Sequence, residues 1–340
     1  MGEVAFRFLQ GSLETSKGSN NAATRKLLAR VTSLNIVQPK EYVEEDRGTL
    51  VAANRYVAGV DDVTLTVEAQ ATFEQLPWFL QTAVRGSVSP TTVGSTGKRA
   101  VFVPNTTTSG DLLQAASLEF GDDTQGYLAR YCEADKWTLG FDALQVGQAA
   151  PLMMTIDYIA KSVTSNSRTT GLQDPTVESI LATGARFMLG DTSTGYGSLS
   201  ELPASLRSLK ITGENKLGRK VFVGDGRQFS AVGPGRRMVT GEMTLEGDAN
   251  GVTRFTEWKT ETQKRMRLIF AGSTISGSSP ATARQLWIDA RFDITEFDVI
   301  GEIDTNTVYL LKFRCVEDAL HATPYSDIAI TVTNDQSSYT

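Results

Sequence analysis

The sequence is poor in the residues on which most enzymes depend. It contains one histidine, His321, and two cysteines, Cys132 and Cys315. Nucleophilic triads and most zinc sites need histidine, and His321 stands in a Leu-His-Ala-Thr-Pro segment typical of a surface turn. The cysteines lie far apart with no metal-ligand spacing, so we expect two reduced, buried thiols. No catalytic, cofactor-binding or metal-binding residue is therefore predicted.

Other absences argue against membrane proteins, exported proteins and proteins that bind nucleic acid tightly. No apolar run reaches the roughly 18–20 residues of a membrane span. Met1 to Gln10 has no apolar stretch, so we expect neither a signal peptide nor membrane insertion by this chain. The formal net charge is −6, whereas proteins that grip nucleic acid carry a basic patch. Tight DNA binding is disfavoured, although loose passage of DNA along an acidic wall is compatible with this charge.

The glycine and carboxylate clusters are typical of turns. Gly224-Asp225-Gly226 and Gly233-Pro234-Gly235 lack the Lys-Ser/Thr ending of a phosphate loop. Asp61-Asp62, Asp122-Asp123 and Glu44-Glu45-Asp46 leave a carboxylate-based hydrolase open, but solvated acids are common in such loops.

An internal repeat is the main positive signal. Ser33-Leu34-Asn35-Ile36 and Ser208-Leu209-Lys210-Ile211 are near copies, each followed by a polar excursion (38–59 and 212–237). The alternating segments 63–69 and 239–246 follow, and then short helical patterns with aromatic residues at 73–81 and 255–261. Two strands close each copy, at 137–142 and 152–160 and at 290–295 and 307–314.

This order predicts a mainly β fold of two tandem, related β-sandwich or half-barrel domains, 1–168 and 169–340. Each has one short α-helix, packed across a sheet with its polar side outward, and one long inter-strand loop. Polar stretches at 165–175, 87–109 and 272–280 are expected to be exposed loops.

One face of the alternating strands is polar in both copies. Thr64, Thr66 and Glu68 line the first, and Glu242, Thr244 and Glu246 line the second. The face is either an ordinary solvated side of an antiparallel sheet or the wall of a water-filled channel past which a polyanion could slide. A shift of one residue in register would exchange the faces.

Residues 206–246, with Pro-Gly-Arg-Arg-Met-Val-Thr-Gly-Glu-Met-Thr-Leu-Glu, and 116–163, with Trp-Thr-Leu-Gly-Phe-Asp, resemble tail tube proteins of long-tailed bacteriophages. The resemblance is one of pattern, without a diagnostic motif. It implies a structural virion protein rather than an enzyme. Six domains, hence three of these two-domain chains, would form a ring, and rings would stack into a hollow tube that conducts DNA.

The resemblance also implies partners and surfaces. The chain would bind copies of itself, a tape measure protein inside the tube, and tail tip and terminator proteins at the ends. It would be assembled in the host cytoplasm, and the duplication favours a non-contractile tail. The polar strand faces would line the lumen, and the two excursions would contact the adjacent ring through Lys40, Glu41, Glu44, Glu45, Asp46, Arg47, Lys216, Arg219, Lys220, Asp225 and Arg227.

Two alternatives remain open from the sequence. A tail terminator or baseplate ring protein would form a closed ring that does not polymerise. A carbohydrate-active or hydrolytic β-sandwich enzyme would be a monomer that loses activity when one carboxylate is removed.

Overall fold

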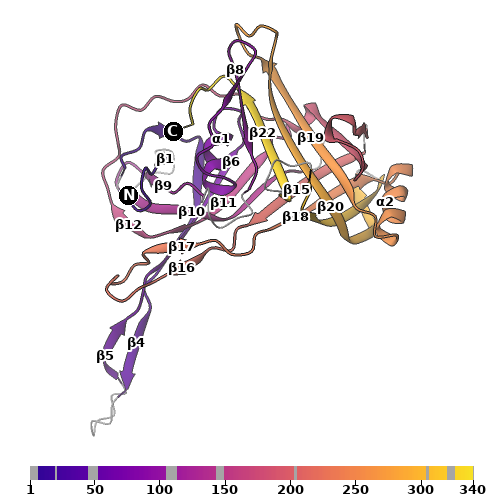
Figure 1. Cartoon of the computed structure of the whole chain (residues 1–340). Coiled ribbons are helices and arrows are strands. Elements are labelled where there is room, and N and C mark those ends of the chain that lie inside the picture. The colour runs from indigo at the N-terminus through magenta and orange to yellow at the C-terminus, as the bar shows by residue number, and fades with distance from the viewer. Residues whose placement is uncertain are drawn as a thin grey trace.

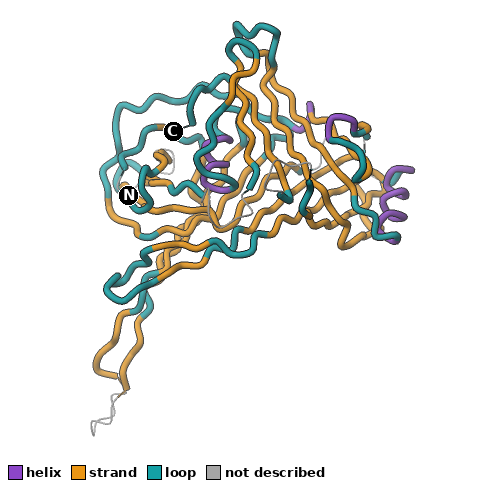
Figure 2. Tube along the Cα trace, viewed as in Figure 1, coloured by secondary structure: helices purple, strands orange, loops and turns teal. Residues whose placement is uncertain are grey.

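The computed structural model describes residues 7–19, 21–44, 53–104, 113–142, 149–202, 205–303, 306–319 and 326–339. Antiparallel strands dominate it, with two α-helices, which confirms the predicted mainly β class (Figures 1 and 2). We call the elements from β1 to β12 the first half and those from β13 to β22 the second half.

The first half contains β1 (Phe8–Leu13), β2 (Arg25–Lys26), β3 (Ala29–Val37), β4 (Lys40–Glu44), β5 (Ala53–Ala58), β6 (Asp62–Gln70), α1 (Leu76–Ala83), β7 (Thr91–Val93), β8 (Gly97–Phe102), β9 (Ala116–Gly121), β10 (Gly126–Phe141), β11 (Met153–Ala160) and β12 (Ser162–Ser165). The second half contains β13 (Ala185–Asp191), β14 (Ser200–Glu201), β15 (Leu206–Glu214), β16 (Gly218–Lys220), β17 (Ala231–Gly233), β18 (Met238–Glu246), α2 (Ala249–Lys259), β19 (Lys264–Thr274), β20 (Ala283–Ile303), β21 (Asn306–Val316) and β22 (Ile328–Asn334).

The two halves repeat one pairing scheme. In the first half, neighbouring strands run in the order β3–β6–β11–β10, and in the second half in the order β15–β18–β21–β20. The outer strands repeat as well, because β1–β9–β10–β12 is matched by β13–β19–β20–β22. Even a bulge recurs, between Val31 and Ser33 in β3 and between Leu206 and Ser208 in β15.

The long strand β10 belongs to two sheets, and β20 likewise pairs with β19 and β22 along its N-terminal part and with β21 along its C-terminal part. In β10 the register shifts between Ala129 and Cys132 and again between Ala134 and Lys136. Within the first of these shifts Tyr131 has a φ of +54°, a left-handed conformation that bends the strand. Its backbone N–H donates to the buried carboxylate of Glu14 at 2.8 Å, which offsets part of the cost of this conformation. The N-terminal part of β10 therefore pairs in one sheet and its C-terminal part in the other.

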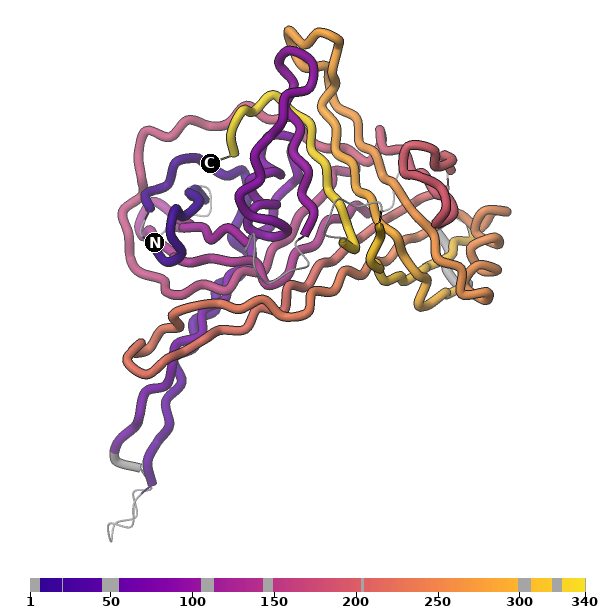
Figure 3. Tube along the Cα trace, viewed as in Figure 1, coloured from indigo at the N-terminus to yellow at the C-terminus, as the bar shows by residue number. Residues whose placement is uncertain are grey.

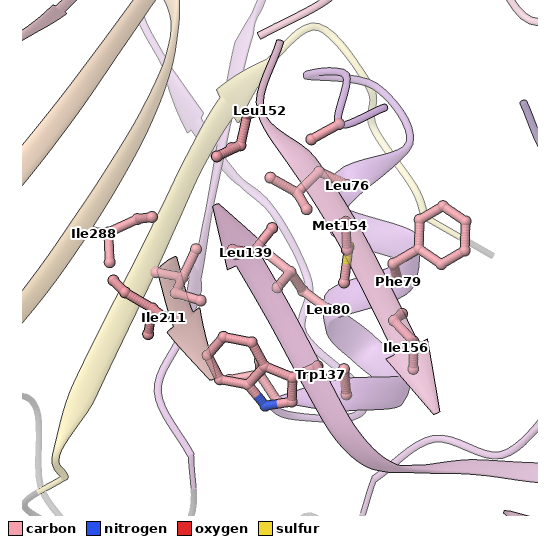
Figure 4. Close-up of a cluster of buried hydrophobic side chains, with 14 of the residues drawn as sticks. Leu76, Phe79, Leu80, Trp137, Leu139, Leu152, Met154, Ile156, Ile211 and Ile288 are labelled. Carbon is pink, nitrogen blue, oxygen red and sulfur yellow. The ribbon is translucent and has the colours of Figure 1, made fainter. Parts of the chain in front are cut away.

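The halves are joined edge to edge. The C-terminal part of β10 pairs antiparallel with β15, so both inner sheets form one continuous surface. One hydrophobic core spans the joint, with Trp137 and Leu139 of β10 close to Ile211 of β15 (Figure 4). Among the described strands, following the pairings from strand to strand never leads back to the start, so the sheet ends in open edges.

Two sequence-based expectations about local structure were wrong. Residues 87–109 were expected to form an exposed loop, yet β8 lies within them and pairs with β22, with Ala100 and Phe102 buried. The helices were expected to show a polar outer side, but every residue of α1 is buried, and Thr82 bonds to the hydroxyl of Tyr158 at 2.9 Å. Strands β8 and β10 pack against α1, and Asn215 of the second half bonds to the carbonyl of Ala83 at its end. A helical pattern read over 73–81 alone cannot reveal these contacts.

The second helix begins earlier than its aromatic pattern indicated. Asp248 caps it by accepting hydrogen bonds from the backbone N–H groups of Asn250 and Gly251, so α2 starts at Ala249 rather than near Phe255. Both cysteines are free and buried, as expected. His321 lies outside the described residues.

Candidate functional site: the polar sheet face and the projecting arms

The polar residues of β6 lie opposite its core side. Val63, Leu65 and Val67 are at most 2% exposed, whereas Thr64, Thr66 and Glu68 alternate with them on the other face. This alternation follows from the two-residue period of a strand.

The polar residues of β18 share that face. Thr66 lies opposite Asp157 of β11, Asp157 opposite Lys136 of β10, and Lys136 opposite Glu214 of β15. Directly opposed residues in an antiparallel sheet point to the same side. Continuing through the pair of Glu214 with Met238 of β18 leads by steps of two to Glu242, Thr244 and Glu246. The two predicted sets therefore lie on one surface that crosses the joint between the halves.

Cations partner the glutamates on this face. Glu68 pairs with Arg30 at 2.7 Å, Glu242 with Lys210 at 3.5 Å, and Glu246 with Arg207 at 3.0 Å. Threonines bond across strands between these pairs, as at Thr138–Thr212 (3.2 Å). The face is thus polar and locally charge-balanced, which differs from the acidic rows that the two sequence segments suggested. Thr244 is only 8% exposed and accepts a hydrogen bond from the Ser208 hydroxyl at 2.9 Å.

The first excursion forms an arm. The hairpin β4–β5 projects away from the body of the protein (Figures 1 and 3). Of the predicted arm residues, Lys40, Glu41 and Glu44 are exposed, and the Lys40 ammonium lies over the Tyr56 ring at 4.9 Å. Glu45, Asp46 and Arg47 lie outside the described residues. A two-stranded hairpin is marginally stable alone, so a partner surface would stabilise this arm.

The second excursion is fastened to the first half. In the hairpin β16–β17 and its loop, Arg219 forms an ion pair with Asp62 at 2.6 Å and Arg227 one with Asp61 at 2.7 Å. Lys216 and Lys220 are exposed, and Asp225 accepts a hydrogen bond from the N–H of Phe222 at 2.6 Å within the loop. Arg219 and Arg227 thus bind residues of their own chain.

Sequence reasoning missed the residues that anchor this second arm. Phe229 and Val232 are buried against Tyr131 and Ile159 of the first half, with the Phe229 and Tyr131 rings 5.4 Å apart. Asn215 donates from one amide nitrogen to the carbonyls of Ala83 (2.9 Å) and Ala134 (2.8 Å). The sequence does place apolar residues in this segment, but Phe222 is 60% exposed whereas Phe229 is buried, so residue type alone does not tell which of them anchors the arm.

The open edges are the third feature of the site. Among the described residues, β3 pairs only with β6, and β20 beyond Phe292 pairs only with β21. Ile36 and Val37 of β3 are 45% and 44% exposed. Exposed apolar residues beside unpaired backbone groups favour the addition of a further strand.

The carboxylates of two of the predicted acidic clusters bond to other groups of the same chain. Asp122 accepts the N–H groups of Gln125 and Thr124, and these bonds lower its pKa. Asp61 and Asp62 bind the arginines of the second arm. Within the described ranges, no group of three His, Cys, Asp or Glu residues is arranged to hold a metal ion. Nor does any helix there have the length and apolar character to cross a membrane.

Comparison with known proteins does not assign this chain to a family. No family model and no curated protein matches the sequence. A solved structure of the SPP1 tail tube is partly similar, at 12% sequence identity and a TM-score of 0.27, over 47% of this chain and 81% of that one. This likeness leaves more than half of the chain unmatched.

Proposed function

We propose that this chain is a structural subunit of a tail tube, in which copies of the chain form rings and the rings stack into a hollow tube. The observation that carries the proposal is the edge-to-edge joint between two repeated units. The joint β10–β15 uses one edge of each unit, and among the described strands the corresponding edges of β3 and β20 are open. Repeating the same joint between chains extends the sheet until the ring closes, which removes every such edge.

The units are the domains 1–168 and 169–340, and three chains give a ring of six. The face with Thr64, Thr66, Glu68, Glu242, Thr244 and Glu246 lines the lumen. Its glutamates are paired with cations and offer no excess of positive charge to phosphate, so DNA passes without sticking. The β4–β5 arm, with Lys40, Glu41, Glu44, Glu45, Asp46 and Arg47, contacts the adjacent ring.

The proposed role also implies where the chain is located and which proteins it contacts. It belongs to a virion, encloses a tape measure protein before ejection, and meets tail tip and terminator proteins at the ends of the tube. No catalytic function is part of this proposal.

Negative-stain microscopy of the purified protein tests the proposal. We expect hollow tubes with an axial repeat, or three-chain rings under conditions that block stacking. Closed rings that never polymerise at high concentration would favour a terminator or baseplate ring component instead. A monomer at all concentrations would contradict both assignments.

The arm has its own test. Deleting Glu41 to Asp46 shortens a segment that projects from the body, so we expect the subunit to fold and form rings that no longer stack. Tubes of normal length from this variant would exclude a stacking role for the arm.

A further inference from the structure

The internal joint between β10 and β15 has a defined register. Thr138 lies opposite Thr212, Leu139 opposite Ile211, and Gly140 opposite Lys210. Leu139 and Ile211 are each 1% exposed, because each half covers the edge of the other. This joint shows which residues an edge of this protein presents to a strand that it accepts.

The open strand β3 corresponds to β15 residue by residue. The shared bulge fixes the alignment, so Ile36 occupies the position of Ile211 and Val37 that of Thr212. Ile36 is 45% exposed and Ile211 only 1%. The same apolar residue type is buried where a partner strand is present and exposed where the described part of the chain provides none.

The open edge of β20 corresponds to the occupied edge of β10. Thr138 lies opposite Thr155, which lies opposite Glu68. Gly301 lies opposite Val308, which lies opposite Glu246. Because Glu68 and Glu246 are equivalent in the repeat, the backbone at Gly301 occupies the place of Thr138.

The helices α1 and α2 also differ in how far their residues are exposed. Every residue of α1 is buried, and Asn215 from the second half bonds to the carbonyl of Ala83 at its C-terminal end. On α2, Val252 and Phe255 are 54% and 37% exposed. Figure 1 shows α2 at the outer end of the second half, away from α1. The second half therefore ends in a surface whose counterpart in the first half is covered.

From these correspondences, and resting on the proposed function, we infer that β20 of one copy pairs antiparallel with β3 of a second copy, with Gly301 opposite Val37. The pairing repeats the β10–β15 joint between chains. It buries Ile36 of the second copy and brings that copy over the exposed side of α2. The partner of both surfaces is thus another molecule of this chain.

Paired cysteines test the register. In the variant Val37→Cys/Gly301→Cys, we expect disulfide-linked chains on oxidation, ending at closed trimers in non-reducing gels. Antiparallel neighbours in this register satisfy the Cα separation of about 4.4–6.8 Å that a disulfide needs. Cys132 and Cys315 are buried and burial raises their thiol pKa well above its ordinary value, so they should add little background.

Two control variants calibrate the result. Thr138→Cys/Thr212→Cys probes the equivalent internal pair and should form a disulfide within one chain, without linking chains. Val37→Cys/Glu296→Cys displaces one partner by about 13 Å along β20 and should not link. Rings or tubes that show no Val37–Gly301 link, or that link through Glu296, would overturn the register while leaving the proposed function intact. Absence of any ring would contradict the proposed function itself.

A charge on the edge gives a second readout that does not depend on disulfide geometry. Ile36→Asp should leave the thermal stability of the free chain close to wild type, since the side chain is nearly half exposed. It should raise the concentration at which rings form by roughly tenfold or more, because the charge would be buried in the joint. Val101→Asp is a matched control on β8 with 44% exposure and should assemble normally. Normal ring formation by Ile36→Asp would contradict the pairing.

Discussion

The contact between Gly213 and Trp137 makes the joint between the halves directly testable. A Cβ atom on Gly213 would lie 2.2–2.4 Å from three atoms of the Trp137 indole, well inside van der Waals contact. The backbones of the two residues are held opposite each other by the β10–β15 pairing, and the indole is 1% exposed within the core. Neither partner has room to move away, so Gly213→Ala overpacks the joint.

Overpacking of this kind costs about 1–3 kcal/mol in the free energy of unfolding. With about 2–4 °C of melting temperature per kcal/mol, we expect Gly213→Ala to lower the Tm by about 2–12 °C. Thermal and urea unfolding followed by circular dichroism would measure both quantities. Gly218→Ala is the matched control, because its new Cβ would meet nothing closer than 3.8 Å. Equal stability of Gly213→Ala and wild type, within about 0.5 kcal/mol, would refute the packing of β15 on Trp137.

Three further changes probe other parts of the fold. Asn215→Ala leaves two buried carbonyls without their donor and should cost about 1–3 kcal/mol, measured by urea unfolding. Burial opposes ionisation of Glu119, but hydrogen bonds, first among them that from Gln10, leave its pKa lowered. Its stabilising contribution is therefore present above the unfolded-state pKa of about 4.3 and is lost as the pH falls, so Glu119→Gln should flatten the loss of stability between pH 6 and 3; an unchanged pH profile would contradict this. Asp248→Ala removes the N-cap of α2 and should cost about 1 kcal/mol, seen as a lower urea midpoint, whereas an unchanged midpoint would argue against the cap.

Local periodicity was sufficient to predict the class of the fold. The alternation in 63–69 and 239–246 placed Leu65 and Met243 on the buried side, where the structure has them. The repeated Ser-Leu-x-Ile segments identified β3 and β15, which occupy equivalent places in the two pairing schemes. Such patterns can be read from the sequence because a strand with one buried and one solvent-exposed face must alternate apolar and polar residues, whatever its tertiary contacts.

Features that depend on the contact between the halves could not be read in this way. Segment 87–109 is rich in turn-forming residues, and the pairing of β8 with β22 joins the β7–β8 hairpin to the main sheet. Phe229 lies in the loop between β16 and β17 and is buried because it packs against Tyr131 of the other half. The glutamates of the polar face seemed to lack cationic partners when the sequence was read. Arg30 and Lys210, which pair with Glu68 and Glu242, lie more than 30 positions earlier in the chain and meet them only through strand pairing.

The amino-acid order of each repeat decides which side of a strand is apolar, where a helix can begin, and which segments are alike, because these depend on neighbours along the chain. The tertiary structure decides which of two like edges is covered. Ile211 is buried and Ile36 is exposed, although both belong to the same motif. The difference arises because β15 pairs with β10, whereas β3 has no such neighbour in the described part of the chain. Burial depends on what lies across an edge and not on the residue itself.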